Sequence, residues 1–220
     1  IPYLNVGEHL LYDGFHSIDT TAGGKVESDI ILPASFLLLT GLAVDAVDGD
    51  VYNRIDQERE SVQGNQSYSA YGQLSWQPVD SLLLLAGARE LYSSKYEDIF
   101  LFKGGARWNF WGPLTVRARI AKNFRQPTLR ELYLPFPTAN PDLKPETSRN
   151  ADAGFELNSK YVIAEVSGYR TSARNLIKYF GVWPSAEVVN IDHLTTYGIE
   201  ERLVLQNLGP MRIAASGNYQ

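Results

Sequence analysis

The sequence contains no cysteine and no long apolar run, and each absence removes a class of protein. Without cysteine, the 220-residue chain has neither a disulfide framework nor a thiolate metal site. None of its apolar runs reaches the roughly 18 residues that indicate a membrane-spanning helix. Residues 1–7 also lack the basic and apolar regions of a signal peptide. We therefore expect neither a transmembrane helix nor a signal peptide in this chain.

A concentrated basic surface and the common catalytic motifs are missing too. The formal net charge is -5 and the lysines and arginines are scattered, whereas nucleic acids are bound by clustered basic residues. There is no nucleophile elbow, phosphate-binding loop or dinucleotide fingerprint. His193 lies near Ser185 and Asn190 along the chain, but this closeness alone does not make a catalytic triad. We expect no nucleic-acid partner and no enzymatic activity.

Metal-ligand patterns are weak. The three histidines, His9, His16 and His193, do not share a strand face with a carboxylate at metal-ligand spacing, which argues against a zinc site. Acidic side chains crowd residues 45–60, largely within a predicted polar loop at residues 48–66, but without the spacing of an EF-hand. We favour a solvated acidic loop over a calcium site or a divalent-ion bridge to lipopolysaccharide for this group: Asp45, Asp48, Asp50, Asp56, Glu58 and Glu60.

The sequence is rich in segments of about ten residues in which apolar and polar side chains alternate, as they do in β-strands. In residues 99–110 one face is aromatic or small, and the other carries Lys103 and Arg107. Residues 114–123 repeat the pattern with Arg117 and Arg119 on the polar face. Further strands are predicted at residues 36–47, 68–77, 81–92, 150–157, 161–171 and 212–220, with Leu83 and Leu85 on the polar face of the third.

Short and long connections alternate between these strands, as in bacterial outer-membrane barrels, where short periplasmic turns alternate with longer extracellular loops. Short turns are predicted near Pro33 and at residues 78–80, 111–113, 158–160 and 207–210. Longer connections are predicted at residues 48–66, 93–98, 125–148 and 181–187. Aromatic residues flank the short turns, where a headgroup girdle would lie: Trp76, Phe110, Trp111 and Tyr161.

These features predict an all-β fold, an antiparallel transmembrane β-barrel segment of about eleven strands. Because open sheet edges cannot exist in hydrocarbon, the strands must pair with others outside this chain or close by themselves with an odd strand number. A soluble sandwich with the aromatic residues in its core is the alternative.

Glu201 conflicts with the predicted register, since it falls on the lipid face of Tyr197, Ile199, Leu203 and Leu205. A bulge or an interfacial position would accommodate it.

Five motifs follow one another in the second half of the chain. They are LTVRARIAKNFRQPTLRELY at 114–133, NPDLKPETS at 140–148, AGFEL at 153–157, GYRTSARNLI at 168–177 and VVNIDHLTTYGIE at 188–200. Their order resembles the barrel of TonB-dependent receptors, and the nearest likeness is to the siderophore and cobalamin receptor branch. With the hairpin at residues 69–91, the likeness covers residues 36–220.

The resemblance implies a barrel of about twenty-two strands, filled by an N-terminal plug, with a periplasmic segment that contacts TonB. We expect residues 1–220 to be about half of the barrel domain, with the plug and signal peptide absent from this chain. The implied location is the outer membrane, and the implied function is TonB-energised import of an iron-siderophore or cobalamin, with no covalent cofactor. The expected partners are the TonB complex, the receptor's own plug, and outer-membrane lipid and lipopolysaccharide. A passive porin-type barrel and a soluble all-β binding module are the alternatives.

The first candidate site residues lie in the long loop. Its five prolines keep it out of the sheet, and in the family this loop folds partly into the barrel mouth. Arg125, Arg130 and Glu131 would then bond to loops or plug, while Tyr133 packs; a role in folding alone is the alternative.

Two further groups are expected to face the plug or the ligand. Lys103, Arg107, Arg117 and Arg119 would lie opposite plug carboxylates or an anionic ligand, or they would simply hold the plug. Tyr169, Tyr179 and Trp183, with Phe180, would form an aromatic platform for a flat chelate near the extracellular rim, or belong to the membrane girdle.

Overall fold

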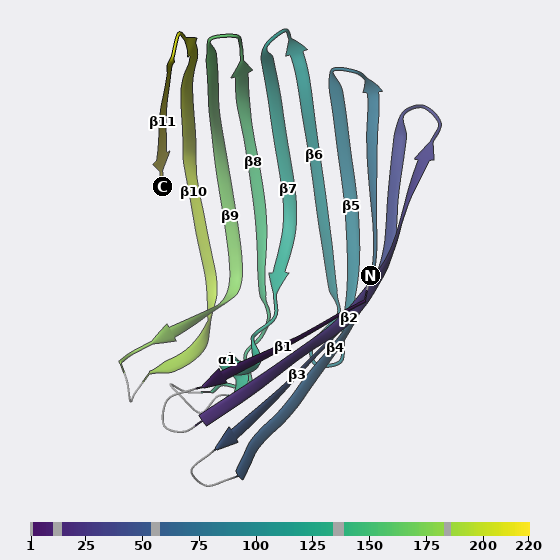
Figure 1. Ribbon diagram of the computed structural model, residues 1–220, viewed down its shortest axis with the longest axis vertical. Coiled ribbons are helices and arrows are strands. Elements are labelled where there is room, and N and C mark those ends of the chain that lie inside the picture. The colour runs from purple at the N-terminus through teal and green to yellow at the C-terminus, as the bar shows by residue number, and fades with distance from the viewer. Residues whose placement is uncertain (1, 11–14, 54–57, 134–138, 183–185) are drawn as a thin grey trace.

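The computed structural model describes residues 2–10, 15–53, 58–133, 139–182 and 186–220. Within these ranges, eleven strands form a single sheet in which each strand pairs with its neighbours in the sequence. Every pairing is antiparallel. The sheet is curved and the strands run side by side from β1 to β11 (Figure 1). This arrangement confirms the all-β barrel-wall fold expected from the alternation.

The strands extend well beyond the predicted segments at several ends. Their bounds are β1 Pro2–Leu10, β2 Phe15–Leu32, β3 Phe36–Asn53, β4 Glu58–Val79, β5 Leu82–Ser93, β6 Ile99–Trp111, β7 Leu114–Arg125, β8 Glu146–Asn158, β9 Val162–Phe180, β10 Glu187–Leu208 and β11 Met211–Tyr219. One short helix, α1 Leu129–Tyr133, lies in the connection between β7 and β8. No helix in the described ranges is long and apolar enough to cross a membrane.

Connections at the two ends of the sheet differ in length, as predicted. Short turns at residues 33–35, 80–81, 112–113, 159–161 and 209–210 lie at the end drawn uppermost in Figure 1. Gly112 and Gly209 have positive φ angles of 44° and 67° in two of these turns, a conformation that other residues adopt less readily. The longer connections lie at the opposite end, which is the extracellular end of such a barrel.

The predicted loop at residues 48–66 is wrong, because most of it belongs to β3 and β4. Their ladder continues as far as the pair Asn53↔Glu58. Beyond the membrane, water bathes both faces of a hairpin, so its side chains need not alternate in polarity while the backbone pairing continues. The acidic residues are therefore spread along two strands, and Asp56 lies outside the described residues. Across the described ranges, no group of three or more His, Asp or Glu side chains could hold a metal ion.

The register gives the sheet one apolar and one polar face. Trp108, Val116, Phe155 and Val166 follow one another across β6 to β9 on the apolar face, and Trp108 and Phe155 are 51% and 54% exposed. The opposite face carries the pair Arg107↔Arg117 and the pair Arg119↔Asp152. A continuous exposed apolar face suits contact with lipid, so the polar face lines the lumen.

Aromatic side chains mark both borders of the apolar face. Near the short turns, the Phe36 and Trp76 rings stack with centroids 5.1 Å apart, and Trp111 and Tyr161 are exposed. A second set lies further along the strands on the same face: Tyr68, Tyr92, Phe100 and Tyr197. Two aromatic borders are the pattern of a membrane-spanning barrel.

Glu201 lies on the apolar face of the sheet, where the predicted register had placed it against the expected alternation. Its neighbours are Val166 in β9 and Gly217 in β11, and the register is continuous on both sides. A bulge therefore does not account for this carboxylate on the lipid face, and no other feature of the described residues explains it.

Candidate functional site

The connection between β7 and β8 is an ordered structure built around α1. The sequence Thr-Leu-Arg-Glu starts this helix with a reciprocal cap. Glu131 Oε2 accepts a hydrogen bond of 2.7 Å from the backbone N–H of Thr128. In return, the Glu131 N–H donates to Thr128 Oγ1 at 3.2 Å. The helix is thus fixed at the point where the chain leaves the sheet.

Arg125, the last residue of β7, joins both ends of this connection. Its guanidinium donates to Glu131 at 3.1 and 3.2 Å and to Glu146, the first residue of β8, at 2.9 and 2.7 Å. Burial alone would raise the pKa of Glu131, but the hydrogen bonds from Arg125 and Thr128 hold it below the ordinary value. Arg125 and Glu131, both predicted site residues, therefore bond to each other within the loop.

One side of the connection is anchored to β10. Leu132, Leu143 and Val188 form a buried cluster, with Tyr133 packed against it. Asn140 Nδ2 donates to the Val188 carbonyl at 2.9 Å. Asn190 accepts from the Lys144 N–H at 2.8 Å and donates to the Lys144 carbonyl at 3.0 Å. The NPDLKPE segment is held against β10 by these contacts.

The other side of the connection reaches β4 and β5. Asn65 Nδ2 donates to Gln126 Oε1 at 2.9 Å, and Ser93 donates to Asn65 Oδ1 at 3.0 Å. Lys95 Nζ contacts the Tyr133 hydroxyl. The connection therefore crosses the extracellular mouth from β10 to β4, and Figure 1 shows α1 among the strand ends there.

A small cavity of about 310 Å³ lies beneath the connection. Tyr96, Lys95, Asn65, Gln126 and Leu129 are among its lining residues. The Tyr96 hydroxyl is buried and has no hydrogen-bond partner among the described residues. Burial, and next the charge of Glu131, raise the pKa of Tyr96 to about 12, so it is a neutral donor at physiological pH.

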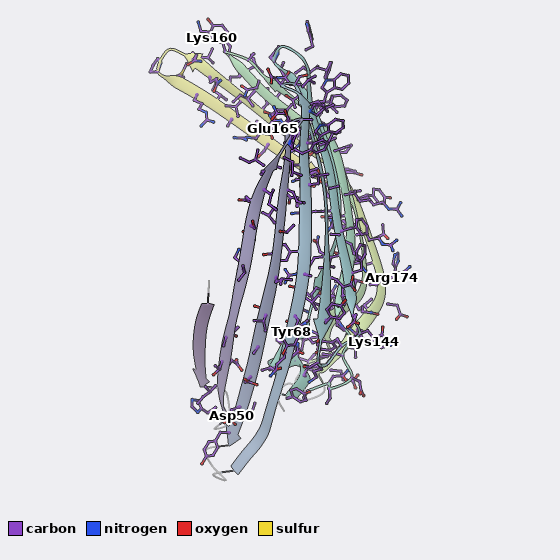
Figure 2. The ribbon with its side chains drawn as sticks, turned by 90° about the vertical axis from the view of Figure 1, so that its right-hand side faces the viewer. Asp50, Tyr68, Lys144, Lys160, Glu165 and Arg174 are labelled. Carbon is purple, nitrogen blue, oxygen red and sulfur yellow. The ribbon has the colours of Figure 1, made fainter. Side chains whose placement is uncertain are left out.

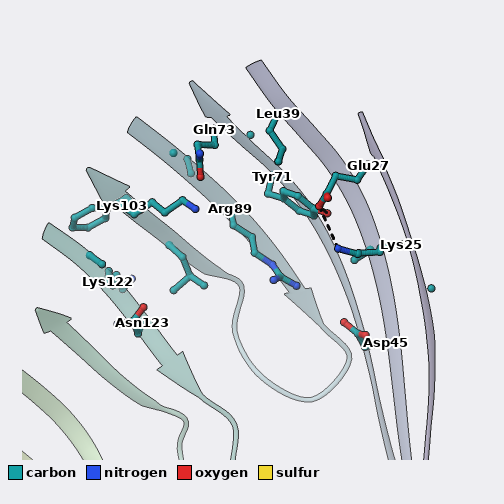
Figure 3. A pocket seen from close by; sticks show the side chains of 18 residues that line it. Lys25, Glu27, Leu39, Asp45, Tyr71, Gln73, Arg89, Lys103, Lys122 and Asn123 are labelled. Carbon is teal, nitrogen blue, oxygen red and sulfur yellow. Dashed lines mark hydrogen bonds and ion pairs between the residues drawn. The ribbon is translucent and has the colours of Figure 1, made fainter. Parts of the chain in front are cut away.

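A larger hollow of about 690 Å³ lies on the lumenal face of the sheet, across β2 to β7. The Tyr71 hydroxyl donates to Glu27 at 2.8 Å, Lys25 lies 3.4 Å from the same carboxylate, and the Arg89 guanidinium lies 5.7 Å from the centre of the Tyr71 ring. Figure 3 shows this row of side chains with Lys103 on the adjoining part of the wall. The hollow presents aromatic, cationic and anionic groups to the lumen.

The four predicted lumenal cations share one face but differ in their partners. Arg107 lies 3.6 Å from Glu156, and Arg119 lies 3.0 Å from Asp152. Lys103 and Arg117 have no carboxylate partner among the described residues, and Arg117 lies directly opposite Arg107. Two of these four charges are thus neutralised within the wall.

Two of the predicted aromatic residues, Tyr169 and Tyr179, lie far apart on β9. Tyr169 lies midway along β9 opposite Asp152, whereas Tyr179 lies near the end of the same strand. Ten residues separate them along the strand, roughly 33 Å at the usual rise. Trp183 and the side chain of Arg130 lie outside the described residues.

Several residues of this site were missed by the sequence analysis. Tyr71, Arg89 and Glu27 escaped because each lies on a different strand, and only the register brings them together. Asn140 begins the NPDLKPETS motif, and its place before Pro141 marks a turn. Nothing in the sequence indicated that it would bond to the Val188 carbonyl of β10. Asn65 fell in the segment predicted as a loop.

An amphipathic sheet of this size, with long loops at one end and one of them folded across the mouth, defines a wall of a large transmembrane barrel. Residues 12–219 match the family model described as TonB dependent receptor-like, beta-barrel. The chain belongs to this family of outer-membrane receptors.

Individual relatives match over part of their length. The chain is 33% identical over 88 residues to the vitamin B12 transporter BtuB of Vibrio vulnificus, covering 38% of this chain and 14% of that protein. It is 34% identical over 91 residues to the hemoglobin-haptoglobin utilization protein B of Neisseria meningitidis serogroup C, covering 38% and 11%. The fold matches the siderophore receptor PirA from Pseudomonas aeruginosa with a TM-score of 0.77 at 18% identity, covering 99% of this chain and 46% of that one.

Proposed function

We propose that this chain forms the lumenal wall and part of the extracellular mouth of a receptor that imports a metal chelate or a cofactor with energy from TonB. The ligand classes are iron-siderophore and cobalamin. The names of the relatives support these classes, because they include a vitamin B12 transporter and a siderophore receptor. The receptor performs no chemistry on its ligand.

The observation that carries this proposal is the ordered connection across the mouth. It is capped at α1, clamped by Arg125, and fixed to both β4 and β10. A passive pore works by leaving its lumen open to solutes, whereas a fixed cover reduces the opening and supplies a binding surface. The arrangement therefore favours a receptor over a diffusion pore.

The lumenal wall supports the same proposal. The hollow at Tyr71 and the unneutralised Lys103 and Arg117 offer hydrogen-bond donors and positive charge to a partner inside the barrel. Guanidinium and ammonium groups suit carboxylates of a plug or an anionic chelate. We assign Lys103 and Arg117 to plug contact, together with Tyr71 and the side chains beside it in the larger hollow. We assign the cavity at Tyr96 to the ligand side of the mouth.

A binding and permeability measurement on the full-length receptor tests this function. The receptor is reconstituted in liposomes and tested for swelling in small sugars, and its affinity is measured for ferric siderophores and cobalamin. We expect no swelling and saturable binding of one of these ligands. Free passage of sugars without saturable binding would show a passive pore instead.

A further inference from the structure

Glu201 is the one charged side chain of the described strands that lies deep on the apolar face of the sheet. It is directly opposite Val166, the fifth residue of β9 after the short turn, roughly 12 Å along the membrane normal for a tilted strand. In Figure 2, Glu165 marks this level of β9, between Lys160 at the short turn and Arg174 further along the strand. The Glu201 carboxylate therefore lies near the middle of the hydrocarbon core.

The charged residues next in depth on the apolar face lie at its outer border. They are Glu90, Lys122 and Arg170, and each is the ninth residue of its strand from the short turn. A barrel strand needs about 9 to 11 residues to cross the hydrocarbon core, so these three reach the headgroups. Arg170 is four residues beyond Val166, roughly 13 Å along β9, and is too far away to pair with Glu201.

The Glu201 carboxylate has no hydrogen bond or ion pair within the described ranges, although the residues on either side of it are both paired on the lumenal face. Glu200 accepts from Asn218 Nδ2 at 3.5 Å, and Arg202 lies 3.6 Å from Glu165. Ionisable side chains in the hydrocarbon region are costly and are almost always paired with one another. We therefore expect a basic group within reach of Glu201.

The surroundings of Glu201 indicate the side from which this group approaches. Large apolar side chains flank it on three sides: Val166 on β9, and Ile199 and Leu203 along β10. On the fourth side, β11 presents Gly217 directly opposite Glu201. Because glycine has no side chain, the surface stays low from Glu201 to the outer edge of β11.

The outer edge of β11 adjoins the next part of the barrel wall. β11 is the last strand of the sheet and pairs with β10 on one side (Figure 1). In hydrocarbon its other edge must be paired with a strand as well. Neighbouring strands lie about 4.8 Å apart, so a residue of that strand opposite Gly217 is roughly 10 Å from Glu201. A long basic side chain spans this distance with its methylene stem against the glycine.

We propose that Glu201 pairs with an arginine or lysine of the strand that adjoins the outer edge of β11, at the position opposite Gly217. This pair sets the register of the two strands. The apolar face of β11 carries Ile213, Ala215 and Gly217, and a shift of two residues would keep all three on that face. Alternation therefore does not exclude the shifted register, whereas the charge pair does, because the shift separates the charges by roughly 7 Å. The inference does not rest on the proposed import, so either can fail alone.

Cysteine cross-linking in the full-length receptor tests the predicted position. Residues 1–220 contain no cysteine. Ser216→Cys on the lumenal face of β11 leaves Glu201 and Gly217 intact, and it is combined with single cysteines along the adjoining strand. The pair that forms a disulfide most readily defines the register. We expect this register to put an arginine or lysine opposite Gly217, and a neutral or acidic residue there would overturn the proposal.

Folding of the full barrel into lipid vesicles measures whether the pair forms. E201Q keeps the shape of the side chain but leaves the basic partner without its counter-charge, and should lower the equilibrium constant for folding about tenfold or more. The matched control E200Q removes the same charge from the lumenal face and should lower it less than about twofold. An unchanged constant for E201Q would overturn the proposal. It would mean that Glu201 faces lipid without a partner, or that its partner belongs to another molecule.

Two further comparisons locate the contact. E201R combined with glutamate in place of the basic partner rebuilds the pair in reverse, and should recover most of the folding lost by either change alone. G217L blocks the path over β11 and should weaken folding. G168L adds the same side chain to the apolar face of β9, where an added Cβ meets nothing closer than a carbonyl oxygen at 3.9 Å, and should weaken folding less. No recovery by the exchange, or equal effects of G217L and G168L, would overturn the proposal.

Discussion

Arg125 is the residue on which the mouth connection depends most. Among the described residues, it is the one that joins the helix α1 to the first residue of β8, through two carboxylates whose side chains are only 10% and 18% exposed. A carboxylate at such a position is costly once its partner is removed. The Glu146 Oε1 atom also accepts from the Ile177 N–H at 2.8 Å, so β9 is linked to the same cluster.

Arg125→Gln should loosen the connection and destabilise it by about 1 to 3 kcal/mol, less than a fully buried pair because the guanidinium is partly exposed. Limited proteolysis of the full receptor checks this through cleavage within residues 126–145. Arg117→Gln, which removes an arginine without a carboxylate partner, is the control. Equal cleavage of both variants would show that the clamp is not needed.

The depressed pKa of Glu131 predicts how the connection responds to acid. Because its folded pKa lies below the ordinary 4.5, its stabilisation is fully present above about pH 4.5 and is lost as the pH falls through the folded value. Proteolysis within the connection should therefore increase below pH 4.5. In Glu131→Gln the connection should already be open to protease at neutral pH, with less further change in acid. A rise in protection on acidification would contradict this.

The position of the Tyr71 ring between β3 and β4 depends on a glycine. The Tyr71 ring lies over Gly41, directly opposite, in the space that a side chain at Gly41 would need. Gly72, on the neighbouring rung and the other face, has its nearest neighbour at 3.7 Å and leaves room for a side chain. The Tyr71 to Glu27 hydrogen bond thus requires an empty position beside it.

Gly41→Val should displace Tyr71 and lower the stability of the barrel by about 1 to 3 kcal/mol, the usual cost of overpacking. Gly72→Val is the matched control and should change stability by less. The midpoint of thermal unfolding in detergent measures both. If Gly41→Val and Gly72→Val have the same effect, the ring does not need this space.

The strands and turns could be predicted from the sequence wherever lipid lies on one face and the lumen on the other. Alternation in residues 99–110 and 114–123 predicted β6 and β7 nearly to their ends. The same logic failed at residues 48–66, since no lipid imposes alternation there. The lumenal cations were predicted, but the partners of Arg107 and Arg119 were not, because pairing across strands depends on register. The loop motif indicated Arg125 and Glu131 without showing that they bind each other.

The sheet as a whole separates two environments, lipid and the barrel lumen. Ala118, the fifth residue of β7 after the short turn, lies on the apolar face, roughly 12 Å along the membrane normal for a tilted strand. This depth is near the middle of the hydrocarbon core. The side of the sheet that carries Glu165 and Arg202 faces water or protein instead.

Ala118→Arg should therefore destabilise the barrel by about 2 to 4 kcal/mol, the cost of an arginine near the bilayer midplane, because its cross-strand neighbours Ala106 and Ala153 offer no carboxylate. Ser216→Arg, on the lumenal face of β11, adds the same group and should cost much less. Refolding of the full barrel into lipid vesicles measures the difference. Equal costs would mean that the two faces are assigned wrongly.

We propose that this wall belongs to a receptor driven by TonB. Uptake of radiolabelled ferric siderophores and cobalamin is measured in cells that express the full-length receptor, with TonB present and with TonB deleted. We predict uptake of one ligand that is saturable with TonB and absent without it. Equal uptake in both strains would contradict import driven by TonB and show a passive barrel.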